Sequence, residues 1–404
     1  MTVRIPLEQH ALHVADLLAP VLSSPAVETV PIEDALGRVT ADDVRSDVDL
    51  PLFRNSQMDG FAVRAADTAA APIALEVSGD VPAGHAVPVV LTPGTAIRIM
   101  TGAPLPTGAD AVVPVEDTEL VLGRDDDLAG AVVEIRTSRA AGEYVRERGS
   151  DLARGEVIVP AGTALAARHL AALASAGVRE VRVRARVRVG ILTTGSELSG
   201  GETVEFGQVF DANGIALAAL VTEAGAAVSF RGTSADDPAA FRAVLDDAVA
   251  VSDLVLTSGG ISQGAFEVVR EVLEPLGARV TTVAMQPGGP QATAVLGGVP
   301  IVCFPGNPVS TQVSFTVFVR AALRNAAGLQ PLDPASALLA TPVHSVAGRR
   351  QFLRGRVTTD GAVEQISGAG SHLVAGMARA DVLIDIPADT TDLEVGADVT
   401  VWTL

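Results

Sequence analysis

Three short loops combine glycine with hydroxyl and acidic side chains, a composition suited to binding anionic oxygens. Each loop follows an apolar run, so backbone N–H groups and hydroxyls would meet a ligand where a helix starts, as in phosphate sites. One such loop would mean little because turns need glycine anyway, but three favour a phosphorylated or oxyanion ligand. None matches a Walker or Rossmann phosphate loop. The candidate residues in these loops are Thr194, Gly195, Ser196, Ser258, Gly259, Gly260, Ser262, Gly264, Pro305, Gly306, Asn307 and Pro308.

Carboxylates accompany the same loops. Glu197 follows the first loop, Asp211 and Asn213 lie in the stretch FDANG, and Glu267 comes shortly after TSGGISQG. Acidic residues beside a phosphate site are explained if a divalent cation lies between them, since Mg²⁺ prefers one or two carboxylates plus phosphate oxygens. Alternatively, Glu197 and Glu267 complement helix dipoles and Asp211 forms an Asx-turn. As a set, the carboxylates favour the metal-assisted hypothesis.

The stretch NSQMDGFAV raises a separate question about Asp59. An Asp-Gly pair is typical of a turn, yet this carboxylate could instead be held for chemistry in a glycine-bounded loop. Among the histidines, His10 and His13 are spaced i, i+3 on a predicted surface helix and are expected to face solvent. His372 could contact a ligand or serve a structural role. Cys303 lies in an apolar strand and is expected to be inert core.

The three loops belong to the segment from 182 to 328, which alternates strand, loop and helix. This alternation predicts an α/β domain with a doubly wound parallel sheet, helices on both faces and ligands at the carboxyl ends of the strands. Before it, residues 47–142 show short β-like runs broken by glycine and proline. After it, residues 329–404 show short strands with Gly and Asp turns, which predict a small β barrel or sandwich. The fold class is therefore α/β plus β-rich domains.

Composition excludes several classes of protein. The net charge of −19 argues against nucleic-acid binding. No apolar run reaches the roughly 20 residues needed to span a bilayer, so we expect no membrane contact and a cytoplasmic location. A single cysteine excludes an internal disulfide. All 29 basic residues are arginine, which indicates codon bias, so an arginine in place of lysine carries little meaning.

The ordered motifs NSQMDGFAV, IMTGAPLPTGADAVVPVED, ERGSDL, GILTTGSEL, FDANG, TSGGISQG and FPGNPVS resemble those of the molybdopterin molybdenumtransferases, the MoeA family, which includes the C-terminal part of gephyrin. The resemblance covers nearly the whole chain, from about Leu7 onward. It implies four domains. We assign residues 1–46 with 143–181 to a discontinuous linking domain, 47–142 to an inserted β-rich domain, 182–328 to the molybdopterin-binding domain and 329–404 to a C-terminal β barrel.

The resemblance also implies a reaction, in which adenylylated molybdopterin and molybdate give molybdenum cofactor and AMP with Mg²⁺ assisting. It implies a homodimer whose active sites combine the α/β domain of one subunit with the Asp59 loop of the other, and contact with the molybdopterin adenylyltransferase. Asp59 and Thr101 match family positions at that site, with Glu197 and Glu267 as further catalytic candidates. The implied metal ligands are Asp59, Glu197, Asp211 and Glu267, and Ser371 joins the implied substrate contacts.

The chain departs from the family pattern at several positions. It has Glu267 where Asp is usual, Arg270 where Lys is usual, and QPGGP (286–290) where the family has KPGKP. Codon bias does not explain Gln286 or Gly289, because arginine was available. Three hypotheses follow: a full transferase in which arginines elsewhere or backbone donors hold the oxyanion, a paralogue that binds the nucleotide or a partner without inserting metal, or a hydrolase of another adenylylated ligand. The retained carboxylates favour the first.

Overall fold

The computed structural model describes residues 4–23, 26–84, 88–124, 127–199, 201, 203–261 and 268–404. Three predicted site residues, Ser262, Gly264 and Glu267, lie outside this described part. The chain divides into a larger unit (Met1–Glu28, Gly37–Ala41 and Arg182–Leu404) and a smaller unit (Thr29–Leu36 and Asp42–Val181). Among the described residues, no helix is both long and apolar enough to cross a membrane.

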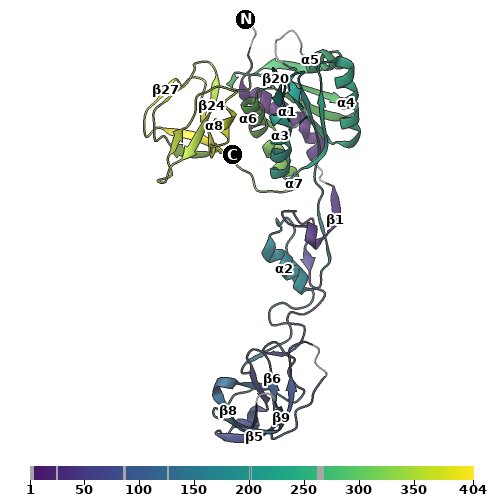
Figure 1. Cartoon of the computed structure of the whole chain (residues 1–404), viewed down its shortest axis with the longest axis vertical. Coiled ribbons are helices and arrows are strands. Elements are labelled where there is room, and N and C mark those ends of the chain that lie inside the picture. Colours follow the sequence, from purple (N-terminus) through teal and green to yellow (C-terminus); the bar gives the residue numbers. More distant parts are fainter. Residues whose placement is uncertain are drawn as a thin grey trace. The chain divides into compact units, whose positions relative to one another are not determined.

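A six-stranded sheet forms the centre of the larger unit, in the order β16-β13-β17-β21-β20-β18 (Figure 1). The first four strands are mutually parallel, as predicted, but β20 is antiparallel to both of its neighbours. The predicted parallel sheet is thus present in four strands, and β20 and β18 extend it into a mixed sheet. Its strands are β13 (Arg188–Thr194), β16 (Ala227–Ser234), β17 (Leu254–Ser258), β18 (Arg279–Thr282), β20 (Pro290–Leu296) and β21 (Val299–Phe304).

The mixed topology has a local cause in the turn between β20 and β21. Gly297 and Gly298 connect the two strands, and both have positive φ, at 58° and 88°. A two-residue hairpin turn with positive φ at both positions matches the right-handed twist of its strands, and glycine adopts it without steric cost. The Gly-Gly pair thus reverses the chain within two residues, where a parallel connection would need a crossover of a dozen or more.

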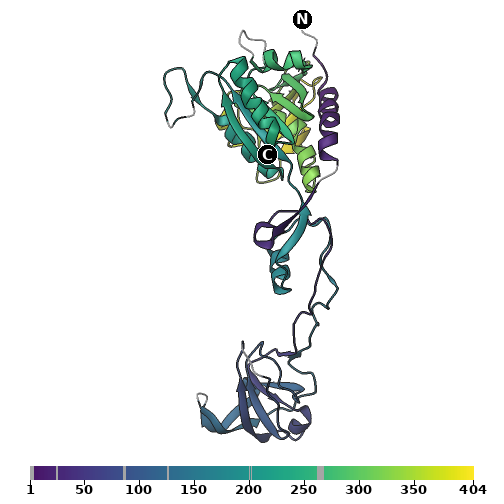
Figure 2. The same ribbon diagram turned by 90° about the vertical axis from the view of Figure 1, so that its right-hand side faces the viewer.

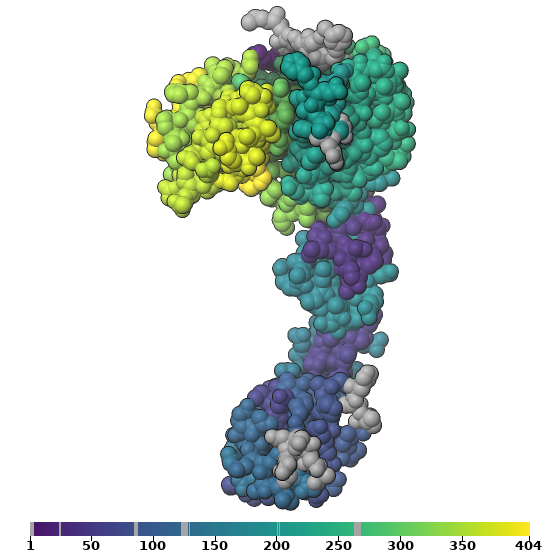
Figure 3. All heavy atoms as spheres, in the orientation of Figure 1, coloured from purple at the N-terminus to yellow at the C-terminus, as the bar shows by residue number. Residues whose placement is uncertain are grey.

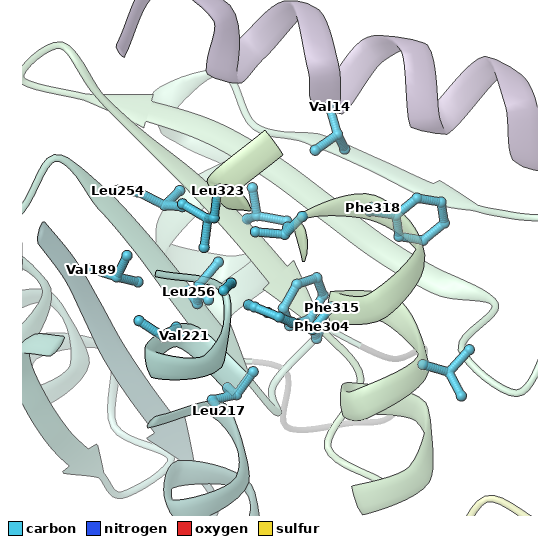
Figure 4. Close-up of a cluster of buried hydrophobic side chains, with 14 of the residues drawn as sticks. Val14, Val189, Leu217, Val221, Leu254, Leu256, Phe304, Phe315, Phe318 and Leu323 are labelled. Atoms are coloured by element: carbon cyan, nitrogen blue, oxygen red, sulfur yellow. The ribbon is translucent and has the colours of Figure 1, made fainter. Parts of the chain in front are cut away.

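Helices cover both faces of this sheet (Figures 1 and 2). Alternate strand residues point to opposite faces, so Val189 and Leu256 join one apolar cluster while Leu192 and Val255 join the other. Figure 4 shows the first cluster, which packs the sheet against four helices. These helices are α1 (Leu7–Leu22), α3 (Ala212–Glu223), α6 (Pro308–Phe318) and α7 (Arg320–Ala327), and the other face carries α4 (Pro238–Val251) and α5 (Val268–Leu273).

Helix α1 buries a face that includes a histidine. Leu7, His10, Val14 and Leu18 are buried, whereas Leu12 is 64% exposed. The prediction that His10 faces solvent was wrong, since its ring packs edge-on against Phe318 with 4.8 Å between ring centroids. The helix lies against α6, α7 and β21, and only one stripe of its surface can face them.

The C-terminal residues build a second, β-rich body within the larger unit, shown in yellow and yellow-green in Figure 3. Its strands follow the order β19-β24-β26-β28-β22, and β25 also pairs with β24. A bridge between Leu339 and Val363 links the end of β22 to β25, so the strands close into a small barrel. The strands are β19 (Met285–Gln286), β22 (Ala335–Leu338), β24 (Arg350–Val357), β25 (Val363–Gln365), β26 (Val382–Ile386) and β28 (Asp398–Thr403).

This barrel is joined to the α/β part through β19, which belongs to the segment preceding the glycines of QPGGP. Met285 and Gln286 pair in parallel with Arg350 and Gln351 of β24. Smaller elements of the larger unit are α8 (Val374–Met377), the pair β14 (Leu198–Ser199) and β15 (Val209–Phe210), and the pair β23 (Val343–His344) and β27 (Asp392–Leu393).

The smaller unit is built on a six-stranded sheet in the order β7-β4-β6-β5-β9-β8. Two apolar clusters pack it, one around Phe61 and Val133 and the other around Ile97 and Ile99. The sheet strands are β4 (Gly60–Val63), β5 (Ile73–Val81), β6 (Thr95–Ile99), β7 (Ala111–Pro114), β8 (Thr118–Arg124) and β9 (Asp127–Ile135). Shorter elements are β2 (Val44–Arg45), β3 (Asn55–Ser56), β10 (Val145–Arg146), β11 (Val157–Val159) and α2 (Ala167–Ser175), while β1 (Val27–Pro31) and β12 (Glu180–Arg184) carry the chain between units.

Candidate functional site

The carboxyl ends of β13, β17 and β21 meet at a cleft of about 790 Å³, here called the carboxyl-end cleft. Thr193 of β13 is in register with Ser258 of β17, which is in register with Phe304 of β21, so the three following loops start at one level. The chain passes from β13 to β16 on one side and then to β17 on the other, which makes this edge a topological switch point. Ligands of open α/β sheets bind at such points.

Glycine is required at the centre of the cleft. Gly259 has a φ of +104°, and a Cβ there would lie 2.4 Å from the Thr194 carbonyl oxygen. A Cβ on Gly306 would lie 3.3 Å from the Gly259 Cα, so the loops after β17 and β21 approach each other backbone to backbone. The Gly259 N–H donates to the Phe304 carbonyl at 3.1 Å. These loops therefore form one fixed cradle.

Polar side chains tie the cradle to helices α3 and α6. The Asn213 amide donates to Ser258 Oγ at 2.9 Å and to the Gly306 carbonyl at 2.7 Å. Ser258 Oγ also lies 3.0 Å from Thr311 Oγ1. Two buried atoms at the cleft, Thr194 Oγ1 and Asn213 Oδ1, have no hydrogen-bond partner in the described part of the chain. An unpaired buried polar atom costs about 1–3 kcal/mol, so a polar ligand or water that pairs with it would be stabilising.

The acidic residues divide into two groups. Glu197 and Asp236 line the cleft, and Asp236 accepts a hydrogen bond from the Ser196 N–H at 2.9 Å. Asp211 instead caps α3, because one of its carboxylate oxygens accepts a hydrogen bond from the Gly214 N–H. Its other oxygen accepts from Thr193 Oγ1. Asp211 therefore has a local structural role, as in the alternative to metal binding. Within the described residues, His, Cys, Asp and Glu form no group of three that could hold a metal by themselves.

Sequence reasoning missed three residues that complete the cleft, Arg4, Asp236 and Arg349. Residues 285–290 and residues 369–372 of the barrel also line it, among them Ser371, an implied substrate contact, and His372, a possible ligand contact. The barrel is held in place by a hydrogen bond from the Val309 N–H of α6 to the Ser371 carbonyl at 3.1 Å. Long-range pairing of β19 with β24 brings Arg349 here, and no local pattern in the sequence indicates such pairing.

The Asp59 carboxylate belongs to the smaller unit, in a loop between β3 and β4. One of its oxygens accepts two hydrogen bonds from Thr101, from the N–H at 2.6 Å and from Oγ1 at 2.7 Å. The backbone and then the side-chain hydrogen bond of Thr101 hold the pKa of Asp59 below its usual value. Gly60 is no turn glycine, since it begins β4 without a positive φ and a Cβ there would lie 2.1 Å from the Val113 oxygen. The loop therefore presents an exposed, ionised carboxylate.

Asp59 lines a separate cleft of about 510 Å³ in the smaller unit, together with residues that include Arg98 and Glu119. Elsewhere, Cys303 is fully buried, as predicted, and burial raises the pKa of its thiol to about 12.

The structure gathers most predicted ligand residues at the carboxyl-end cleft. It leaves Ser196, Asp211 and Pro308 outside the lining of this cleft, and it places Asp59 and Thr101 in the smaller unit. The predicted residues in the lining are Thr194, Gly195, Glu197, Asn213, Ser258, Gly259, Gly260, Pro305, Gly306, Asn307 and Ser371.

Comparisons with known proteins match the chain along most of its length. Residues 5–177 match the MoeA N-terminal region (domain I and II), residues 190–325 match a probable molybdopterin binding domain, and residues 336–404 match the MoeA C-terminal region (domain IV). Molybdopterin molybdenumtransferase 2 of Mycobacterium tuberculosis (strain ATCC 25618 / H37Rv) is 43% identical over 391 residues, covering 93% of this chain and 95% of that protein. A molybdopterin molybdenumtransferase of Nostoc sp. is 35% identical over 394 residues, covering 93% and 88%.

Solved structures give the same result. The crystal structure of the molybdopterin biosynthesis MoeA protein from Pyrococcus horikosii superposes with a TM-score of 0.76 at 34% sequence identity. The alignment covers 99% of both chains. The predicted resemblance and the predicted fold class, α/β with a β-rich C-terminal domain, are thereby confirmed.

Proposed function

Because the chain belongs to the MoeA family of molybdopterin molybdenumtransferases, which insert molybdenum during molybdenum cofactor biosynthesis, we propose that it converts adenylylated molybdopterin and molybdate into molybdenum cofactor and AMP. Family membership makes the chain a transferase with molybdopterin and molybdate as substrates. That the molybdopterin is adenylylated and that the reaction uses Mg²⁺ are further parts of the proposal.

The observation that carries the proposal is the cradle at the carboxyl-end cleft. Three glycine-containing strand ends and the start of α6 face one cavity, where Asn213 and Ser258 fix the backbone. Splitting a phosphoanhydride develops negative charge on its oxygens, and N–H donors fixed before the reaction stabilise that charge without reorganising. Ser371 and His372 from the barrel would bound the ligand on the opposite side.

The residues present also fit Mg²⁺. This ion keeps several water ligands and takes one or two carboxylates plus phosphate oxygens, so it needs no cage of three acidic residues. Glu197 and Asp236 line the cleft and would hold it, with Asp59 of the second subunit a further candidate. When bound, Mg²⁺ would neutralise charge on the diphosphate. Asp211, whose two oxygens already serve Gly214 and Thr193, is the weaker candidate.

Three further parts of the proposal concern the protein's surroundings. We expect a homodimer in which the Asp59 carboxylate of one subunit serves the cleft of the other. We expect the chain to take its substrate from the molybdopterin adenylyltransferase, by contact with that protein, in the cytoplasm. A carboxylate that is exposed and held by two hydrogen bonds from Thr101 supports the first expectation, since it is fixed where a ligand could reach it.

The decisive experiment is release of AMP from adenylylated molybdopterin with Mg²⁺, with and without molybdate. We expect molybdate-dependent release by the wild type and a loss of about a hundredfold in Glu197→Gln, because a carboxylate at the cleft is removed without a change in volume. Glu205→Gln is the matched control, since Glu205 is exposed and outside the described lining of the cleft. Tight nucleotide binding without molybdate-dependent release would contradict the proposal and favour a binding-only role.

A further inference from the structure

The sequence QPGGP leaves one question about the cleft, because it lacks both cations of the related KPGKP. Residues 286–290 line the cleft and would face the molybdate, so a dianion must find its countercharge elsewhere. The protein as a whole carries a net charge of −19, which repels anions. Glu197 and Asp236 add negative charge to the cleft itself. A cationic side chain at the rim would offset this negative charge and favour binding of molybdate.

Arg4 reaches the same rim from the N-terminal segment. The Ile5 N–H donates to the Thr282 carbonyl at 2.9 Å, and the Ala284 N–H donates to the Ile5 carbonyl at 2.8 Å. On the side away from Ile5, the Val283 N–H donates to the Gly289 carbonyl at 2.7 Å. The stretch from Thr282 to Ala284 thus lies between the N-terminal segment and QPGGP.

This arrangement puts the backbone of Arg4 about two strand spacings, or roughly 10 Å, from that of Gly289. An arginine side chain can cross most of such a gap. Arg4 and Arg349 both line the cleft, and within the described residues neither has an ion-pair partner, whereas the nearby Arg350 is paired with both Glu8 and Asp385. Of the two, Arg4 is the one that the pairing through Val283 brings beside Gly289. An unpaired guanidinium at a cleft suits an oxyanion, because its planar fork binds two oxygens at once.

We propose that Arg4 is a substrate-binding residue for molybdate, and that it supplies the positive charge that position 289 does not carry in this chain. This inference rests on the proposed function. It identifies Arg4 as a residue that sets oxyanion affinity rather than one that carries out bond cleavage. It also explains how a transferase can keep glycine at position 289.

The test measures binding of molybdate alone to the full chain by calorimetry. Arg4→Gln should weaken molybdate binding at least tenfold, and it should raise the KM for molybdate in the AMP-release assay while kcat at saturating molybdate stays near the wild-type value. Arg231→Gln is the matched control. It removes the same charge from an exposed position of the same unit, on β16 and outside the described lining of the cleft. We expect it to bind as the wild type does.

A rescue variant separates charge from structure. Gly289 has no positive φ, and a Cβ there would meet only ordinary contacts, at 3.5 Å from the Val283 oxygen and 3.6 Å from the Met285 oxygen. Lysine at this position should therefore be tolerated, and Arg4→Gln combined with Gly289→Lys should regain affinity to within about threefold of the wild type. Gly288, with a φ of +97°, would not accept the same change.

The outcomes are distinct. Wild-type affinity in Arg4→Gln, or no recovery in the double variant, would overturn the role of Arg4. The proposed function would still stand if the wild type releases AMP in a molybdate-dependent way. Absence of molybdate binding and of molybdate-dependent release in the wild type would overturn both. Weakened binding in Arg4→Gln with recovery in the double variant supports the inference.

Discussion

At the scale of single residues, the pair Asp59 and Thr101 shows how a loop prepares a carboxylate. Two donors from one threonine converge on one carboxylate oxygen, which lowers the pKa of Asp59, and among the described residues no hydrogen bond is made to its other oxygen. Because the folded-state pKa lies below the unfolded one, this interaction contributes to stability above the ordinary pKa of aspartate. The contribution is lost as the pH falls through the folded value.

Removing the hydroxyl of Thr101 should therefore change Asp59 before it changes the fold. We expect Thr101→Val to raise the pKa of Asp59, measured by carboxyl NMR titration, and to lower kcat/KM for AMP release about tenfold through lost positioning. Thr101→Ser keeps the hydroxyl and should retain both properties. An unchanged titration in Thr101→Val would show that the backbone N–H alone sets the pKa.

At the scale of elements, helix α1 carries an unusual buried histidine. His10 is 1% exposed, and neither ring nitrogen has a hydrogen-bond partner among the described residues. Burial, followed by the nearby charges of His13 and Arg279, lowers the pKa of His10 to about 4. The folded state thus binds the proton more weakly than the unfolded state, whose pKa is 6.5. Stability from this group is present above pH 6.5 and is lost as the pH falls toward 4.

The corresponding prediction concerns the free energy of unfolding of the larger unit. It should fall by about 3 kcal/mol between pH 6.5 and pH 4 on account of His10, since each pKa unit corresponds to 1.36 kcal/mol. His10→Leu should remove that part of the slope. Denaturant titrations of both proteins across this range give a difference curve in which other titrating groups cancel. Parallel curves would contradict the assignment.

The same elements show what the sequence could and could not indicate. The alternation of strands and helices between 182 and 328 and the glycine loops were predictable, because strand ends and turns are set by local residue patterns. The burial of His10 was not, because a histidine on a helix is expected to face solvent and only packing on α6 and α7 places it inside. Arg4, Asp236 and Arg349 reach the cleft through pairings that join distant segments, which one sequence does not encode locally.

At the scale of the whole molecule, the proposed shared active site makes a quantitative prediction. Glu197 belongs to the larger unit and Asp59 to the smaller unit. If each site combines a cleft from one subunit with an Asp59 loop from the other, then a variant defective in either residue alone is inactive. A heterodimer of Asp59→Ala with Glu197→Gln nevertheless contains one site in which both residues are intact.

Random mixing of the two inactive variants by unfolding and refolding together should therefore restore about a quarter of the wild-type AMP release, because half of the dimers are mixed and each has one working site of two. A mixture of Glu197→Gln with Gly259→Ala, two changes in the same cleft, should restore nothing, since every site then lacks a cleft residue. Recovery in neither mixture would place Asp59 and Glu197 of one subunit in the same site. The whole-molecule prediction would then fail, although the residue-scale behaviour of Asp59 would not.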